Sequence, residues 1–313
     1  MTGSDDDPGS VGPILERWQL SYLETHPNTF MKWEPAEYSP SRIVPEFRSI
    51  LAEYRRLSEV AKRSLPCELN VRYGDAESEV LHHFPPRRGE SPLLVYVHGG
   101  HWQELSIDDS CFAARALVEQ GAGLVAVGYR LAPEGTLDAM VSSVARALDW
   151  VVANASALGG TPQTIHAAGS SAGAHLLAMA LGSAPPAASV RLAGVALLSG
   201  VYDLSLIRLT YVNDALELTE ADARRNSPIH FLPIRAAEVL VARGETETSE
   251  YRSQHALLVA ALRRAGGTAA RGAVVRSVVC RGRNHFDLPL GLGDPQDELG
   301  RAVLRQMRLG SRA

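Results

Sequence analysis

The residues best suited to covalent chemistry lie in the motif Gly169-Ser170-Ser171-Ala172-Gly173. An apolar run precedes this motif, and a helical run, Ala174–Leu181, follows it. A strand, a sharp turn that carries a serine, and a helix form the context of a nucleophile elbow, where flanking glycines allow close backbone approach. Only Ser171 has a glycine two residues away on each side, so Ser171 rather than Ser170 is the predicted nucleophile.

A second motif, His98-Gly99-Gly100-His101-Trp102, directly follows the apolar run Leu93–Val97. The elbow motif alone would fit a flexible glycine turn equally well, and the second motif favours the catalytic interpretation. Small residues here allow backbone N–H groups to point at a developing oxyanion, together with the N–H that follows the nucleophile. We therefore expect an oxyanion hole formed by Gly99, Gly100, His101 and Ala172. The alternative is an ordinary tight turn, and His98 itself is expected to be structural.

The candidate general base is a histidine near the carboxyl terminus. His285 follows the last apolar run, Val274–Cys280, at the expected start of a loop. Serine hydrolases built on a strand–elbow–helix unit present their partners in the order serine, acid, histidine. Four other histidines are expected on the surface or in a cap (His82, His83, His230, His255), and His175, one turn into the elbow helix, is expected to face the core or a neighbouring loop. No pair of histidines has metal-ligand spacing, so no metal or other cofactor is expected.

The acid that orients the imidazole is sought between the serine and the histidine. The segment Arg243–Tyr251 is rich in carboxylates and precedes a helical run. Glu247 is the preferred acid, while Glu245 and Asp203 stay open as alternatives. Glu250 is better placed to support the first turn of the helix through its dipole.

The elements that would position these residues alternate between short valine-rich runs and helical stretches, which is the pattern of a mainly parallel α/β sheet. The candidate strands are Leu93–Val97, Leu124–Gly128, Thr164–Ala168, Val195–Leu198, Glu238–Ala242 and Val274–Cys280. One predicted helix carries Leu137, Val141, Val144, Leu148 and Val151 on a single face and ends near Gly159-Gly160.

The chain is expected to form one domain over residues 13–313 after a disordered start at residues 1–12. From Pro13 to about Ser64 the pattern is helical and includes an apolar face that could pack over a site or against the sheet. Residues 203–233 are too many for an ordinary connection between a strand and a helix, so they are a predicted cap insertion.

Composition excludes several classes of function. The 313 residues carry 31 basic and 35 acidic side chains, a formal net charge of −4, so neither nucleic acid nor an anionic membrane is an expected partner. The chain has no run long and apolar enough for a membrane helix, and its start lacks the apolar region of a signal peptide. Its three cysteines (Cys67, Cys111, Cys280) are widely spaced. We expect a cytoplasmic protein with reduced thiols, and homo-oligomer formation stays open.

Together these motifs resemble the kynurenine formamidase (arylformamidase) family of α/β-hydrolases, which is related to the hormone-sensitive-lipase-like esterases. The resemblance runs from about Tyr38 to Asp287. Its marks are HGGHW at 98–102, GYRLAPE at 128–134, GSSAGAHL at 169–176, SGVYDL at 199–204, NSPIHF at 226–231 and NHFD at 284–287, with the GExExxEY loop that follows Arg243.

The resemblance implies an α/β-hydrolase fold with a small helical cap, Ser171 as nucleophile, Glu247 as acid and His285 as base. Two positions depart from the family pattern: His101 replaces a tyrosine, and Glu247 replaces an aspartate. Glutamate serves the same orienting role in known serine hydrolases, so catalysis should survive.

The implied reaction is hydrolysis of an aryl formamide, N-formylkynurenine, to kynurenine and formate through a formyl-serine intermediate, as in tryptophan catabolism. Four aromatic residues could form a wall for this small-molecule aryl substrate, or could simply pack in the core: Trp102, Tyr202, Tyr211 and Phe286. The alternatives are a short-chain carboxylesterase and a non-catalytic ligand-binding homologue, the last disfavoured because both Ser171 and His285 are present.

Overall fold

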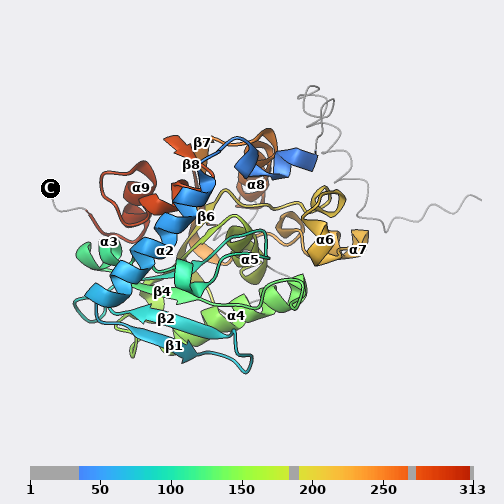
Figure 1. The fold of residues 1–313 in the computed structure, drawn as a ribbon. Coiled ribbons are helices and arrows are strands. Elements are labelled where there is room, and N and C mark those ends of the chain that lie inside the picture. The colour runs from blue at the N-terminus through green and yellow to red at the C-terminus, as the bar shows by residue number, and fades with distance from the viewer. Residues whose placement is uncertain (1–34, 183–189, 267–272, 311–313) are drawn as a thin grey trace, which may run out of the picture.

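The computed structural model describes residues 35–182, 190–266 and 273–310, which fold around one eight-stranded sheet (Figure 1). The strands lie in the order β1-β2-β4-β3-β5-β6-β7-β8. Their bounds are β1 Glu68–Arg72, β2 Val80–Phe84, β3 Leu93–Val97, β4 Gly123–Val127, β5 Ile165–Ser170, β6 Leu192–Leu198, β7 Ala236–Thr246 and β8 Val274–Asn284. Neighbours from β4 to β8 are parallel, whereas β2 is antiparallel to both β1 and β4. The predicted mainly parallel α/β sheet is confirmed.

Successive side chains of the central strands point to opposite faces of the sheet and enter two separate cores. In β3, Val95 and Val97 belong to one core, while Leu94 and Tyr96 belong to the other. All five residues of β3 are buried. Because both faces of the sheet are covered, these strands are continuous apolar runs rather than alternating apolar and polar residues.

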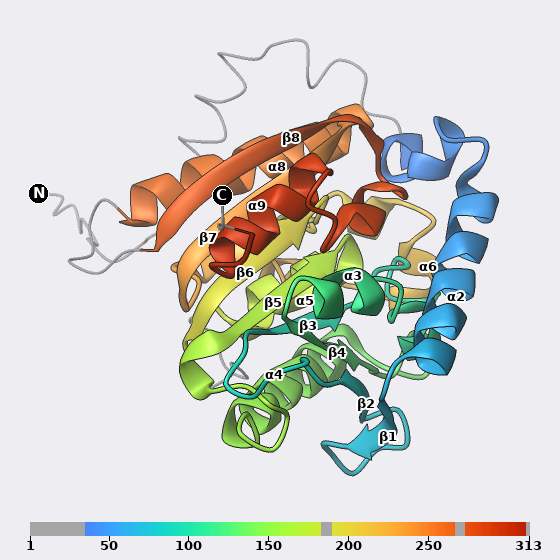
Figure 2. The same cartoon turned by 90° about the vertical axis from the view of Figure 1, so that its left-hand side faces the viewer.

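Helices cover both faces (Figure 2). One core includes side chains of α4 (Leu137–Ala153), α5 (Ala172–Ala180) and α8 (Ser249–Gly266). The other includes side chains of α2 (Phe47–Ser64), α3 (Ala114–Glu119) and α9 (Glu298–Gln306). All five apolar positions predicted for one face of α4 are buried. That helix ends at Ala153, several residues before the predicted stop.

The antiparallel hairpin of β1 and β2 was not among the predicted strands, because two histidines interrupt the apolar pattern of β2. His82 and His83, predicted to be exposed, are each only 2% exposed. Hydrogen bonds make this burial tolerable: His82 Nδ1 accepts from the Asn70 amide at 3.1 Å, and His83 Nε2 lies 3.1 Å from the Leu158 carbonyl. His255 is likewise buried, against Ser277, so its predicted exposure is also wrong.

Short helices connect β6 to β7 within the predicted cap region, residues 203–233. They are η5 (Ile207–Leu209), α6 (Asn213–Leu216), α7 (Glu220–Arg225) and η6 (Pro228–His230). Figure 1 shows α6 and α7 together at one end of the molecule. Their role as a cap stays a prediction, and residues 1–12 lie outside the described residues.

The segment before β1 begins with η1 (Pro35–Tyr38) and η2 (Pro40–Arg42) and leads into α2. Glu37 accepts hydrogen bonds from the amide and the hydroxyl of Ser249 at 2.9 and 2.6 Å, at the start of α8. This contact joins the described N-terminal segment to the helix that follows β7.

None of the described helices combines the length and apolar character needed to cross a bilayer. The three cysteines are free thiols.

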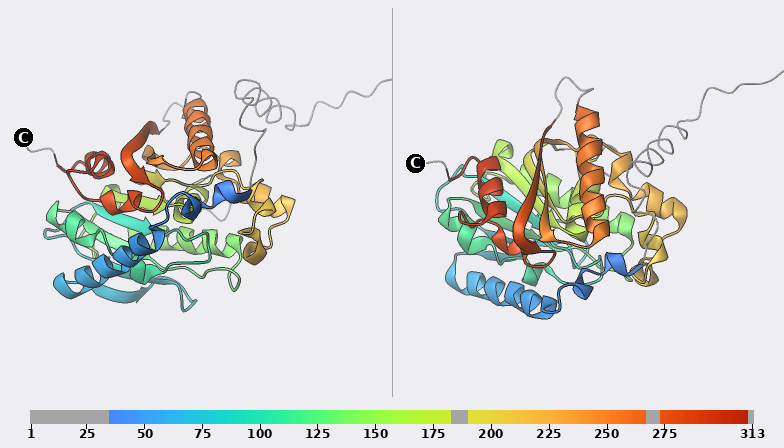
Figure 3. Two further views of the ribbon diagram at one scale, coloured as in Figure 1. Left: turned by 45° about the horizontal axis from the view of Figure 1, so that its top comes forward. Right: turned by 90° about the horizontal axis from the view of Figure 1, so that it is seen from above.

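The carboxyl ends of the parallel strands meet at one edge of the sheet, and the loops that follow β3, β5, β6, β7 and β8 therefore come together there. Seen from above, β8 runs beside β7 with α8 close by (Figure 3). This edge receives the residues that the sequence singled out.

Candidate active site

Ser171 occupies a strained turn between β5 and α5. Its backbone has φ 54° and ψ −118°, and its amide donates to the Leu198 carbonyl at 2.8 Å. A Cβ at Gly169 would lie 2.5 Å from the Gly173 carbonyl oxygen, and one at Gly173 would lie 2.1 Å from the Val97 carbonyl oxygen. The two glycines therefore allow the close approach that the elbow requires, and this turn presents the serine at the strand edge.

His285 and Glu247 meet at the ends of the last two strands. His285 Nδ1 lies 3.1 Å from Glu247 Oε2, and both side chains are buried. The second carboxylate oxygen of Glu247 accepts from the Ser199 hydroxyl and from the Gly244 amide at 3.4 Å. Because an ionised carboxylate only accepts, Nδ1 of His285 is the protonated nitrogen and Nε2 is free to take a proton.

The two alternative acids lie elsewhere. Asp203 Oδ1 accepts from the Ser205 amide at 2.9 Å, and Glu245 Oε2 accepts from the Gly282 amide at 2.9 Å. Neither carboxylate forms a hydrogen bond with His285 in the part of the chain that the structure describes. The geometry therefore places Glu247, and not its rivals, beside the imidazole.

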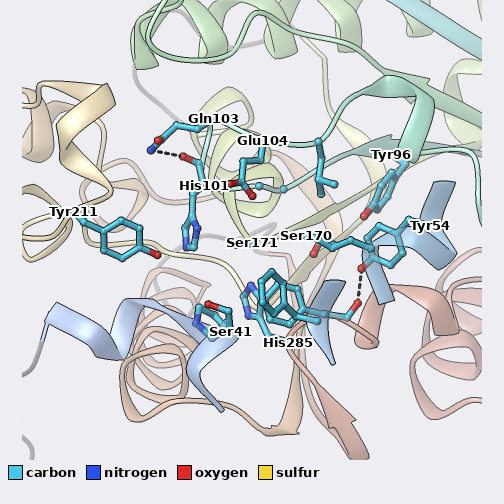
Figure 4. A pocket seen from close by; sticks show the side chains of 17 residues that line it. Ser41, Tyr54, Tyr96, His101, Gln103, Glu104, Ser170, Ser171, Tyr211 and His285 are labelled. Carbon is cyan, nitrogen blue, oxygen red and sulfur yellow. Dashed lines mark hydrogen bonds between the residues drawn. The ribbon is translucent and has the colours of Figure 1, made fainter. Parts of the chain in front are cut away.

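Ser171 and His285 line the same pocket, a cavity of about 190 Å³ (Figure 4). Within the described residues the Ser171 hydroxyl forms no hydrogen bond with His285, and its polar neighbour is the Tyr251 hydroxyl. Hydrogen bonds between a nucleophile and its base are often loose in unliganded enzymes and tighten when substrate binds. The arrangement can thus support attack by a serine that His285 deprotonates.

The loop after β3 has an unusual backbone. Gly100, His101 and Trp102 all have positive φ, at 97°, 50° and 63°. The amides of Gly99, Gly100 and His101 donate to no acceptor among the described residues, and neither does that of Ala172 at the start of α5. Such free N–H groups beside the nucleophile are what an oxyanion requires.

His98 stabilises this loop, as expected. Its Nδ1 lies 2.9 Å from the Gly99 carbonyl, and its ring stacks on Tyr129 with the centroids 4.4 Å apart. Burial lowers the pKa of His98 to about 4, so the ring is neutral at physiological pH.

The pocket lining comes from five parts of the chain: η2 and α2, the loop at residues 99–105 with Tyr96 before it, the elbow, the cap region and the end of β8. From α2 come Phe47, Leu51 and Tyr54. The Tyr54 hydroxyl donates to the Phe286 carbonyl at 2.5 Å. Of the predicted helical segment from Pro13 to about Ser64, the described part therefore packs over the site, and residues 13–34 lie outside the described residues.

Two of the four predicted aromatic wall residues line the pocket, and two do not. Tyr211 and Phe286 are part of the lining. Trp102 is fully buried, and its indole N–H donates to His175 Nδ1 at 3.2 Å. Tyr202 is also fully buried. The prediction that Trp102 and Tyr202 contact substrate is therefore wrong: their rings pack in the core.

Tyr251 and the side chain of His101 are site residues that the sequence did not reveal. The Tyr251 ring packs on the His285 ring with centroids 4.4 Å apart, and its hydroxyl lies 3.3 Å from His101 Nε2. Burial, and then the nearby His285, lower the pKa of His101 to about 4. The Tyr38 backbone shifts this pKa in the opposite direction.

These features define an α/β-hydrolase, and a family model described as the α/β-hydrolase fold matches residues 94–242. Kynurenine formamidase of Danio rerio is 38% identical over 245 residues, which cover 74% of this chain and 82% of that protein. Kynurenine formamidase of Salmo salar is 41% identical over 195 residues, or 59% and 65% of the two chains. The chain belongs to the kynurenine formamidase family, as its motifs indicated.

Other relatives share the fold. A carboxylesterase of Mycobacterium tuberculosis is 36% identical over 176 residues, covering 55% of this chain and 53% of that protein. A solved structure from Silicibacter sp. TM1040 has a TM-score of 0.74 and 24% identity, covering 85% of this chain and 96% of that chain. A thermophilic esterase of Thermogutta terrifontis has a TM-score of 0.61 and 21% identity, covering 79% and 97%. At these identities the two structures establish the fold alone.

Proposed function

We propose that this protein is a serine arylformamidase that hydrolyses N-formylkynurenine to kynurenine and formate. The observation that carries the proposal is that Ser171 and His285 line one pocket, with Glu247 hydrogen-bonded to His285 behind it, in a member of the kynurenine formamidase family. Tyr211 and Phe286 supply aromatic surface for an aryl substrate at the same pocket.

The first half of the reaction acylates the enzyme. His285 Nε2 removes the proton of Ser171 as Oγ attacks the formyl carbon, and the carbonyl oxygen becomes an oxyanion. The free N–H groups of Gly100, His101 and Ala172 stabilise that charge. Glu247 holds the imidazole in one tautomer and stabilises the imidazolium, since Nδ1 keeps its proton throughout.

Departure of the arylamine requires acid catalysis. An aniline nitrogen is a poor leaving group as its anion, so His285 returns the proton to the nitrogen as the C–N bond breaks. This step leaves a formyl group on Ser171. Water activated by His285 then attacks the formyl-serine, and formate and free Ser171 are released.

The proposal is tested by measuring kcat/KM for N-formylkynurenine beside p-nitrophenyl acetate, with kynurenine identified as the product. We expect efficient hydrolysis of the formamide. His285→Ala should lose more activity on the formamide than on the activated ester, because p-nitrophenolate leaves without a proton. Rapid cleavage of the ester with no turnover of N-formylkynurenine would contradict the formamidase assignment.

A short-chain carboxylesterase is the second candidate, and the similarity to the mycobacterial carboxylesterase favours it. An ester substrate would use the same nucleophile and oxyanion hole. It would not depend on proton delivery to nitrogen, which is why the two substrates compared above distinguish these functions.

A further inference from the structure

The pocket contains a carboxylate that the proposed reaction does not use. Glu104 lines the same cavity as Ser171 and His285, and its side chain reaches toward the space between His101 and Ser170 (Figure 4). The residue is exposed. Its carboxylate forms no hydrogen bond or ion pair with another residue of the described ranges. A ligand that fills the cavity displaces water from this charge, which is costly unless the ligand supplies a complementary group.

The backbone of Glu104 is fixed relative to the oxyanion loop. Its amide donates to the Gly100 carbonyl at 2.8 Å, as does that of Gln103 at 2.9 Å. Gly100 packs so closely on this turn that an added Cβ would lie 2.1 Å from the Glu104 carbonyl oxygen. The carboxylate therefore starts from a defined point beside the groups assigned to the reacting carbonyl.

The charges of the residues that line the pocket determine which ligand charge is favoured. The imidazole of His101 is neutral at physiological pH, because burial lowers its pKa to about 4. The carboxylate of Glu104 therefore makes the electrostatic potential negative in this part of the pocket. A cation bound beside it is stabilised by Coulomb attraction, which is stronger where water is partly excluded.

We infer that Glu104 is a specificity-determining residue that binds the ammonium group of the substrate. The site then takes aryl formamides whose ring substituent ends in a protonated primary amine, a class that includes N-formylkynurenine. This inference rests on the proposed function. It adds a substrate group, the ammonium, that the enzyme recognises at a distance from the scissile bond.

Because the ammonium is distant from the scissile bond, Glu104 should affect KM rather than kcat. The ammonium does not change during formyl transfer, so its ion pair stabilises bound substrate and transition state alike. Glu104→Gln should raise KM about fivefold with little change in kcat, the size expected for an ion pair open to water. The effect should shrink as salt screens the pair.

The decisive experiment compares two substrates with two enzymes. N-formylkynurenine carries the ammonium, and its α-N-acetyl derivative keeps the ring, formamide and carboxylate but lacks the positive charge. We expect Glu104→Gln to weaken kcat/KM about fivefold on the first and to leave the second unchanged or slightly improved, because the second is an anion that the carboxylate repels. The matched control is Glu77→Gln, since Glu77 is exposed and absent from the pocket lining. Equal effects on the two substrates, or none, would overturn the inference.

A binding measurement separates this inference from the proposed function. Calorimetric titration with kynurenine and with α-N-acetylkynurenine requires no turnover. We expect wild-type protein to prefer kynurenine and Glu104→Gln to lose that preference. If wild type shows the preference and Glu104→Gln loses it while neither formamide is hydrolysed, the proposed function fails and the ammonium site stands; a preference that Glu104→Gln keeps would overturn the assignment to Glu104. If wild type and Glu104→Gln bind both ligands alike, the ammonium site fails even where hydrolysis is observed.

Discussion

Glu247 accepts hydrogen bonds from three groups, and together they determine what the neighbouring imidazole can do. The Ser199 hydroxyl and the Gly244 amide hold one carboxylate oxygen, and His285 Nδ1 approaches the other. With both oxygens engaged, the carboxylate cannot turn away from the ring. Glutamate, one methylene longer than the aspartate of the family pattern, still reaches the imidazole from the end of β7.

The first prediction at this scale concerns that carboxylate. Glu247→Gln should lower kcat by up to about 10⁴, because an amide NH₂ facing Nδ1 favours the wrong tautomer and cannot stabilise the imidazolium. Asp203→Asn and Glu245→Gln should retain nearly full kcat. Severe loss in Asp203→Asn together with an active Glu247→Gln would show that the acid comes from the loop after β6 instead.

The second prediction at the scale of residues concerns the two adjacent serines, both of which line the pocket. Ser171→Ala should lower kcat by about 10⁶ and abolish labelling by a fluorophosphonate. Ser170→Ala should cost far less, because the Ser170 side chain interacts with the buried Tyr96 hydroxyl rather than with the base. Labelling that persists in Ser171→Ala but disappears in Ser170→Ala would reverse the assignment of the nucleophile.

At the scale of elements, the loop after β3 positions oxyanion donors only because its backbone adopts left-handed conformations. Gly100 provides the first of them, at φ 97°, and the chain then turns back so that Gln103 and Glu104 both donate to its carbonyl. The turn also sends Trp102 into the core, where it bonds His175. One loop thus anchors itself beneath the site, while Gly99, Gly100 and His101, whose amides donate to no acceptor among the described residues, line the pocket.

Gly100→Ala should therefore lower kcat by about 10² to 10³, the loss typical of one displaced oxyanion donor. A methyl group at this position would collide with the Glu104 carbonyl and move the loop. Gly121→Ala is the matched control, because Gly121 has nearly the same φ, 91°, but an added Cβ there would meet no atom within 4 Å. Comparable losses of kcat in both variants would mean that backbone strain, and not displacement of the donors, causes the effect.

Parts of this site were predictable from the sequence and parts were not. Ser171 and its glycines form a local motif whose spacing alone defines the turn, and His285 follows the last apolar run. Tyr251 joins the site only because α8 begins immediately after β7, where the sequence indicated a loop. Trp102 stands beside the predicted oxyanion hole, yet its ring points to the core. Such side-chain directions depend on backbone dihedrals and long-range packing, which spacing does not encode.

The dependence of burial on long-range packing also explains why β2 was not predicted. β2 contains His82 and His83 in the middle of its five residues, so its apolar pattern is weak. Partners distant in sequence, Asp108 and the Leu158 carbonyl, make the burial of these rings acceptable. The predicted strands β3 and β4 needed no such partners, because all of their residues are buried and both of their faces meet apolar side chains.

For the molecule as a whole, buried neutral histidines link stability to acid. Burial is the first cause that lowers the pKa of His98, His101, His175 and His255 to about 4. In the unfolded chain these rings titrate near 6.5. The unfolded state therefore binds more protons between these values, so stability is full above about pH 6.5 and falls as the pH drops toward 4.

Urea unfolding at pH 7.5, 6 and 5 should show this loss in the free energy of unfolding. Each such histidine contributes at most about 1.4 kcal/mol per pH unit. His255→Gln removes one titrating ring that lies outside the pocket lining, so its stability should depend less steeply on pH than that of wild type. A free energy of unfolding that is flat between pH 6.5 and 5, or a slope unchanged in His255→Gln, would contradict this account.

The position of β8 at the border of the sheet has a consequence for how the enzyme loses activity. Among the described strands, β8 pairs with β7 alone, and most of its residues are exposed or only partly buried. The base, His285, is the first residue after it. Border strands open by local fluctuations at lower free energy than central ones. Amides of β8 should therefore exchange with deuterium before those of β3 and β5. Mild denaturant should abolish activity while the centre of the sheet, which carries the nucleophile, remains folded.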